Sequence, residues 1–219
     1  MTKAALQAGA PHIPASATRA VSLRGSSGGS LALDMINTET LDRGRQRDVL
    51  SSPDALARWW GEACQRYPDQ CVIKGAGEPI AWTSELLDTI KSLRMALRTL
   101  ATQVVEHHAV EEEDLNPVNE ILALGYAALE GTEQGNVKAG MRLHDPEKGS
   151  VVVPIAHSAL QLLTEFDWRR LHQCKHDHCI VFFYDTTKSG TRRWCSPGCM
   201  NRARSSYRYQ LTKKAASRQ

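Results

Sequence analysis

Apolar residues recur at helical spacing through the middle of the chain. From Leu86 to Val104, large aliphatic side chains stand alternately four and three residues apart, which draws one stripe along a helix of about six turns. Either Thr83 or Ser84 begins this helix. Another helix is expected near residues 112–130, where apolar positions follow an acidic start that suits the positive end of a helix dipole.

Two more segments predict helices nearer the N-terminus. Residues 28–38 carry two glycines and then an apolar stretch, for which a helix is the better prediction. Residues Ser52-Pro53-Asp54 combine a capping hydroxyl, a proline for the first helical position and an acid for the first turn. The helix that they open is expected to stop before Pro68.

The pattern changes at Gly131, where short segments replace the helical stripes. Residues 136–144 and 150–154 flank the sequence Asp-Pro-Glu-Lys-Gly at 145–149, which is typical of a turn. A short β-hairpin is therefore predicted there. A last helix is expected near residues 155–166, so this part of the chain predicts a mostly helical domain with one small β element.

Four of the six cysteines form two local pairs near the C-terminus. The pattern is Cys-x4-Cys, then 15 residues, then Cys-x3-Cys, and it predicts one structural zinc ion. Residues 180–184 and 191–194 would form a hairpin between the pairs, and Ser196-Pro197 would open a terminal helix that carries the fourth ligand. This describes a treble-clef-like finger. The expected ligands are Cys174, Cys179, Cys195 and Cys199.

Alternatives to this zinc site remain open. The four residues could instead be buried free cysteines, and nearby histidines compete as ligands, although each is expected at the surface or beside the ligands. These histidines are His172, His176 and His178. Cys64 and Cys71 lack a matching pair and are expected to pack in the core. Four protein ligands leave zinc no open position, so the metal is not expected to be catalytic.

Charge is distributed unevenly along the chain. From Arg169 to the end there are 12 basic and two acidic residues, a net charge of +10, whereas the preceding residues carry 15 basic and 22 acidic residues, a net charge of −7. A basic end on an acidic body favours a polyanionic partner at that end, although a solvated tail is the alternative.

No apolar run is long enough to cross a membrane. The start of the chain lacks the apolar segment typical of a secretory signal peptide. A cytoplasmic protein is therefore expected.

The terminal helix supplies much of this positive charge. Met200, Ala203, Tyr207 and Leu211 share one face and are expected to pack on the finger's hairpin. The basic side chains of this helix and of the preceding hairpin suit phosphate contacts with DNA, whereas the alternative is that Arg192 and Arg193 brace the finger or pair with the acidic body. The predicted DNA contacts are Arg192, Arg193, Arg202, Arg204 and Arg208.

Residues 169–210 resemble the CGNR-type zinc finger. The likeness lies in the first cysteine pair, in Arg-Arg-Trp-Cys-Ser at 192–196, and in Cys-x-Asn-Arg-Ala at 199–203, followed by Tyr207-Arg208. In two respects the chain departs from the family: Met200 replaces the glycine of the namesake tetrad, and the second cysteine pair is one residue tighter.

The preceding residues resemble the ABATE domain that accompanies this finger. The matching stretches are Gly-Gly-Ser-Leu-Ala-Leu-Asp-Met-Ile-Asn-Thr at 28–38, Leu-Arg-Met-Ala-Leu at 93–97 and Leu-Asn-Pro-Val-Asn at 115–119. The family is described as stress-induced bacterial transcription regulators. The expected organisation is a flexible lead-in at 1–19, a mostly helical domain at 20–166, the finger at 167–212 and a basic tail at 213–219.

Polar residues within the helical domain suggest a small-molecule pocket. Asp34 and Asn37 stand three apart inside an apolar run, and with Arg94 they would line the pocket, with Trp59 or Trp60 as an apolar wall. The alternative is a buried polar network that positions the helices. No phosphate loop, nucleophile elbow or His-Glu-x-x-His motif is present, so an enzyme is not expected.

These inferences predict an α+β, mostly α-helical protein that regulates transcription. Its helical N-terminal domain would carry a small β-hairpin and act as a sensor or dimerisation module, and its C-terminal treble-clef-like zinc finger would bind DNA. A small-molecule effector and a homodimer are further expectations. The alternative function is an adaptor whose basic finger docks an acidic protein.

Overall fold

The computed structural model describes residues 29–42, 44–71 and 79–216. The predicted lead-in at 1–19, the start of the predicted domain at 20–28 and the last three residues of the predicted tail lie outside it. Seven α-helices and three two-stranded antiparallel sheets form in the described part of the chain. The predicted α+β, mostly helical fold class is therefore confirmed. None of the described helices is long and apolar enough to cross a membrane.

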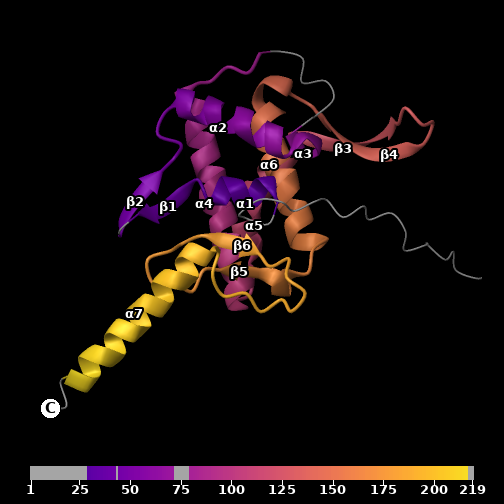
Figure 1. The fold of residues 1–219 in the computed structure, drawn as a ribbon. Coiled ribbons are helices and arrows are strands. Elements are labelled where there is room, and N and C mark those ends of the chain that lie inside the picture. Colours follow the sequence, from indigo (N-terminus) through magenta and orange to yellow (C-terminus); the bar gives the residue numbers. More distant parts are fainter. Residues whose placement is uncertain (1–28, 43, 72–78, 217–219) are drawn as a thin grey trace, which may run out of the picture.

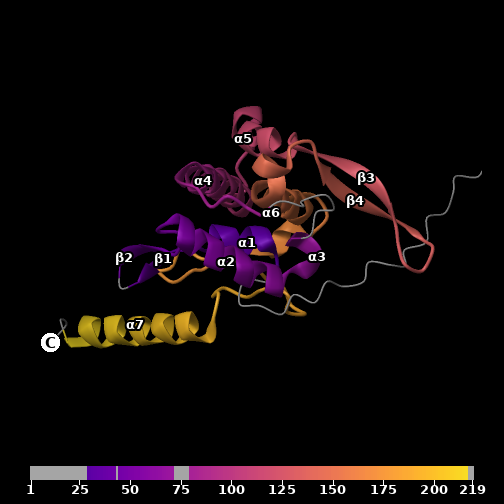
Figure 2. The ribbon, with the colours of Figure 1, turned by 90° about the horizontal axis from the view of Figure 1, so that it is seen from above.

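Helix α1 (Leu31–Ile36) lies at the centre of the body, against α4 (Ser84–Glu106) and α6 (Pro146–Thr164) (Figures 1 and 2). Its apolar side chains are completely or almost completely buried, and Asp34 alone among its residues is partly exposed. In α4 the predicted stripe faces this core, since Ile90, Leu93 and Leu97 are buried. The core therefore forms between three helices that are far apart in the sequence.

The capping signals locate two helix starts correctly. Ser52 begins α2 (Pro53–Arg66), and its hydroxyl accepts a hydrogen bond from the backbone N–H of Ala55 at 3.2 Å. Thr83 caps α4 in the same way, with Leu86 N as the donor at 3.1 Å. Helix α2 ends before Pro68, as predicted, and Pro68 opens the short helix α3 (Pro68–Cys71).

The hairpin predicted around residues 145–149 is wrong, because this segment begins helix α6. Asp145 caps the helix, with its Oδ1 accepting hydrogen bonds from the N–H groups of Glu147 and Lys148 at 3.0 and 3.3 Å. Pro146 then occupies the first turn. Asp-Pro-Glu is a helix start as well as a turn signal, and burial of Val151–Val153 offsets their weak helix propensity.

The β element lies earlier, within the helix predicted near residues 112–130. Helix α5 (Glu112–Leu122) ends sooner than predicted, and strand β3 (Gly125–Gly131) pairs with β4 (Val137–Leu143). This hairpin extends away from the helices (Figure 1). Leu129 was expected on the helix and is 80% exposed on the hairpin, because the strand leaves the body before reaching it.

A second hairpin, not predicted from the sequence, joins α1 to α2. Strand β1 (Glu39–Asp42) pairs with β2 (Arg45–Asp48), and Gly44 adopts a positive φ of +80° in the turn. Arg94 of α4 fastens the hairpin to the body, since its guanidinium donates to both carboxylate oxygens of Asp48 at 2.6 and 2.8 Å. Arg94 is therefore part of a polar network.

The finger is joined to the body through the main core. It contains the 3-10 turn η1 (Trp168–Arg170), strands β5 (Leu171–Gln173) and β6 (Phe182–Tyr184), and helix α7 (Pro197–Ala216). Three of its side chains belong to the body's hydrophobic cluster: Leu171, Phe182 and Tyr184. The finger therefore shares part of its apolar packing with the helical body, while Phe183 and three of the zinc-ligand cysteines form a second cluster.

Candidate metal centre and nucleic-acid interface

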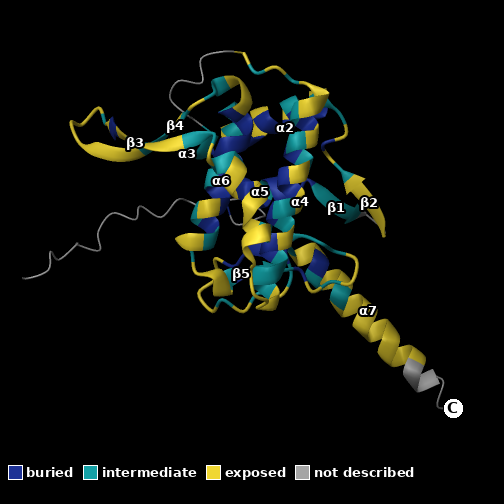
Figure 3. Cartoon of the chain, turned by 180° about the vertical axis from the view of Figure 1, so that it is seen from behind, coloured by how far each residue is buried: buried dark blue, intermediate teal, exposed yellow. Residues whose placement is uncertain are grey.

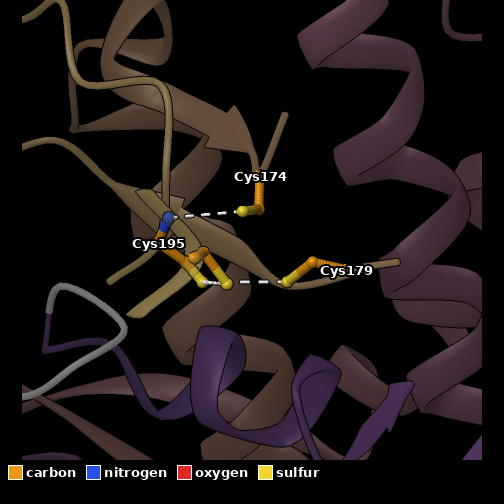
Figure 4. Close-up of side chains that lie close together, drawn as sticks. Cys174, Cys179 and Cys195 are labelled. Carbon is orange, nitrogen blue, oxygen red and sulfur yellow. Dashed lines mark hydrogen bonds between the residues drawn. The ribbon is translucent and has the colours of Figure 1, made fainter. Parts of the chain in front are cut away.

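The four predicted cysteines converge on one point in the finger. Their sulfur atoms all lie within 4.8 Å of one another, and the Sγ atoms of Cys195 and Cys199 are 3.5 Å apart. Figure 4 shows three of these side chains pointing toward a common centre. Cys174, Cys195 and Cys199 are buried and Cys179 is partly buried. Such a compact, sulfur-only set of four ligands fits a structural zinc ion.

Each half of the finger places its own pair of ligands. Cys174 follows β5, and its backbone N–H donates to the carbonyl of Val181 at 2.9 Å, which turns the chain back toward β6. Cys199 lies in the first turn of α7, where the Ser196 hydroxyl accepts a hydrogen bond from Cys199 N at 3.2 Å. The predicted Ser-Pro helix start and the position of the fourth ligand are confirmed.

The hairpin predicted between the cysteine pairs has a different partner strand. Strand β6 lies where the 180–184 strand was predicted, but it pairs with β5, upstream of the first cysteine. Residues 191–194 form no strand. They are held instead by Asp185, whose carboxylate accepts hydrogen bonds from the N–H groups of Thr187 and Arg192 at 2.9 and 2.8 Å.

The pKa values of the cysteine thiols indicate that the cluster requires a bound cation. Hydrogen bonding with Cys195 lowers the pKa of Cys179 to about 5. The same interaction and burial raise the pKa of Cys195, and burial raises the pKa of Cys174. Four thiolates at this separation repel one another, so a bound cation is needed to hold all four deprotonated. The cluster is the site of one structural zinc ion.

The five arginines predicted to contact DNA occupy different environments. Arg192 is directed into the finger: its Nε donates to the Trp194 carbonyl at 2.8 Å and its guanidinium lies 4.9 Å from the centre of the Phe183 ring. These contacts agree with the bracing alternative. Arg193 is exposed beside Trp194. Three arginines remain on α7, where all are exposed: Arg202, Arg204 and Arg208.

Helix α7 projects from the finger into solvent (Figures 1 and 2). The prediction that its apolar residues pack on a hairpin is therefore wrong for Tyr207 and Leu211, which are 63% and 49% exposed. Only the first turns touch the finger, and there Arg202 Nη2 donates to Cys199 Sγ at 3.2 Å. These residues do lie on a helix, as their spacing predicted, but no surface of the described chain covers them.

Three of the four residues predicted to line a pocket do lie together. Asp34, Asn37 and Trp59 border a cavity of about 390 Å³, whose wall also includes Cys195 and Ser196 of the finger. Arg94 does not line this cavity, because it pairs with Asp48 instead. The cavity therefore lies between the helical body and the zinc site.

Sequence reasoning missed the residues that attach the finger to the body. The side-chain amide of Asn37 forms two hydrogen bonds with the backbone of Phe182, at 2.8 and 2.9 Å. Arg98 donates to the carbonyls of Ile36 and Ile180 at 2.9 and 2.6 Å. For Arg98 the sequence did contain a signal, because this cation lies next to the apolar stripe of the helix at 84–106. A charged group so close to the core requires hydrogen-bond acceptors nearby.

Comparisons with known families agree with this description. The model of the ABATE family, described as "Putative stress-induced transcription regulator", matches residues 29–165, which is more than half of the chain. The model of the CGNR zinc finger matches residues 170–210. Both resemblances drawn from the sequence are thereby confirmed. No curated protein matches the chain.

Proposed function

Because the chain belongs to the ABATE family and carries a CGNR zinc finger, we propose that it is a transcription regulator whose finger binds DNA. Helix α7 is the observation that carries the proposal. Its twenty residues include five basic and no acidic ones. From Arg204 onward every described side chain is exposed. An exposed cationic helix of this kind suits a polyanion.

The dimensions of α7 also fit a DNA groove. A helix of this length extends about 30 Å, and the major groove of B-DNA, about 12 Å wide, admits an α-helix. The zinc site anchors the first turn of α7, because Cys199 lies within it. Asn37 and Arg98 in turn hold the finger on the body. These contacts would present the helix in one orientation to a duplex.

In this proposal the protein acts by binding and carries out no catalytic step. It would work in the cytoplasm, where bacterial DNA lies. The experiment that tests DNA binding is selection of the zinc-loaded, full-length protein against a pool of random duplex DNA. We expect an enriched motif, and we expect Arg202→Gln to lose binding to it while still retaining one zinc ion per chain.

The outcomes of this selection separate the proposal from the adaptor alternative. A palindromic motif would show in addition that two copies bind paired half-sites. Uniform weak binding that disappears with added salt would leave only general phosphate attraction. The finger would then be better explained as a docking site for an acidic protein, and the DNA-binding proposal would be abandoned.

We further propose that the cavity beside Asp34 and Trp59 binds a small-molecule effector. The supporting observation is that its wall includes both the body and residues Cys195 and Ser196 at the base of α7. A ligand there would contact the elements that position the DNA-binding helix. A compound found by thermal-shift screening should lose its effect in Asp34→Ala without an equal loss of the ligand-free melting temperature. Equal losses would identify Asp34 as purely structural.

A further inference from the structure

An open cleft separates the base of α7 from the body. Its volume is about 730 Å³, and Leu41 of β1 is one of its lining residues. His176 and His178, from the loop between the first two zinc ligands, also line it. The β1–β2 hairpin and α7 project from the same side of the molecule in two perpendicular views (Figures 1 and 2).

The chemistry of this cleft is that of an anion site. Every polar side chain lining it can donate a hydrogen bond, and among its described lining residues there is no carboxylate. A ligand with several acceptor oxygens and negative charge matches such a surface. The polar side chains contributed by α7 are Asn201, Arg202, Ser205 and Ser206.

The donor surface continues along α7 beyond the cleft. Counting from Arg202, residues three or four apart share one face of the helix, and this face continues to Tyr209 and Lys213. All of these side chains are exposed. Arg204 and Leu211 lie on the opposite face. We call the first set the cleft stripe, and its members are Arg202, Ser205, Ser206, Tyr209 and Lys213.

We propose that the cleft stripe, together with His176 and His178, binds the phosphodiester backbone of DNA. This inference rests on the DNA-binding function proposed above and specifies which face of α7 carries it. One phosphate lies in the cleft and its neighbours follow the stripe outward, with Tyr209 placed to donate from its hydroxyl. Leu41 also lines the cleft, so the β1–β2 hairpin contributes to the shape of the site.

The test compares two substitutions that change the net charge equally. Ser206→Asp places a carboxylate in the cleft, and Leu211→Asp places one on the opposite face. Binding of the zinc-loaded, full-length protein to a labelled random-sequence duplex is measured by fluorescence anisotropy at several salt concentrations. We expect Ser206→Asp to weaken binding at least about tenfold and Leu211→Asp less than about threefold, since phosphate contacts dominate non-specific affinity.

The outcomes distinguish this inference from the proposed function. If the unsubstituted protein binds no duplex, the proposed DNA-binding function is overturned. If it binds and both aspartate variants weaken binding equally, the cleft stripe is overturned, and the selection for an enriched motif then decides the proposed function. Should Ser206→Asp lose its zinc or helix content, Lys213→Gln and Arg204→Gln replace the pair. Only Lys213→Gln should then reduce the slope of log K against log salt by about 0.9, and equal slopes would overturn the stripe.

Discussion

Helices α4 and α7 are similar in length, at 23 and 20 residues, but they are stabilised in different ways. One side of α4 is buried along most of its length, whereas α7 is exposed almost throughout (Figure 3). The cations of α4 are paired, since Arg94 binds Asp48 and Arg98 binds backbone carbonyls. Packing against the body thus stabilises α4. Helix α7 depends instead on its zinc-bound first turn and presents its remaining length to solvent.

Metal removal should give the largest difference between the two helices in hydrogen-exchange protection. Structural zinc contributes about 10–16 kcal/mol of apparent folding free energy in small fingers, and Cys199 is the only ligand within α7. We expect a chelator, or Cys199→Ser, to abolish hydrogen-exchange protection in α7 while α4 keeps most of its protection. Hydrogen exchange with mass spectrometry of peptides measures both helices in one experiment.

Cys64→Ser is the matched control for this experiment, because Cys64 lies in α2 outside the metal cluster. It should retain one zinc ion per chain and full protection of α7. Retention of stoichiometric zinc by Cys199→Ser would contradict the four-cysteine site. Equal loss of protection in α4 and α7 would show that the body requires the finger in order to fold.

Matched leucine substitutions in α4 and α7 should give the next largest difference, in the free energy of unfolding. Leu97 is 2% exposed in the stripe of α4, and Leu211 is 49% exposed on α7. Leu97→Ala should lower the free energy of unfolding by about 2–5 kcal/mol through lost burial and a residual cavity. Leu211→Ala should change it by less than about 0.5 kcal/mol. Urea titration followed by tryptophan fluorescence measures both, and comparable losses would mean that α7 is packed in solution.

The ion pair between Arg94 and Asp48 predicts a pH dependence for the stability of the helical body. Burial alone would raise the pKa of Asp48, but hydrogen bonds from Arg94 and from Leu50 N lower it below its ordinary value. A lowered pKa in the folded state stabilises the protein above the unfolded value, near 4, and this contribution is lost as the pH falls through the folded value. Asp48→Asn should therefore lower the free energy of unfolding by about 1–3 kcal/mol at pH 7.

The difference between Asp48→Asn and the unsubstituted protein should shrink as the pH falls below about 4. Urea titrations at pH 7, 5 and 3.5 measure it. Asp54→Asn is a control at the exposed start of α2. A difference that stays constant with pH would show that the carboxylate of Asp48 does not act as a charged partner.

The same contrast explains how much of the structure could be predicted. The α4 stripe, the caps at Ser52 and Ser196, and the cysteine cluster depend on local spacing, and all were predicted. The β1–β2 hairpin and the attachment of Asn37 to Phe182 depend on contacts between distant residues, which local patterns do not contain. The Asp145-Pro146 signal was compatible with both a turn and a helix, and burial of the valines after it favoured the helix. For α7, helical spacing predicted a packed face that no other element of the described chain covers.

The smallest expected effect tests whether α7 projects in solution. Arg204 is exposed and forms no ion pair or side-chain hydrogen bond with any residue in the described part of the chain. Arg204→Gln should therefore change the free energy of unfolding by less than about 0.5 kcal/mol. Arg98→Gln on α4 is the matched control, and it should cost about 1–3 kcal/mol because two backbone carbonyls lose a charged donor. A loss above about 1 kcal/mol for Arg204→Gln would indicate that this face of α7 folds back onto the acidic body and does not project into solvent.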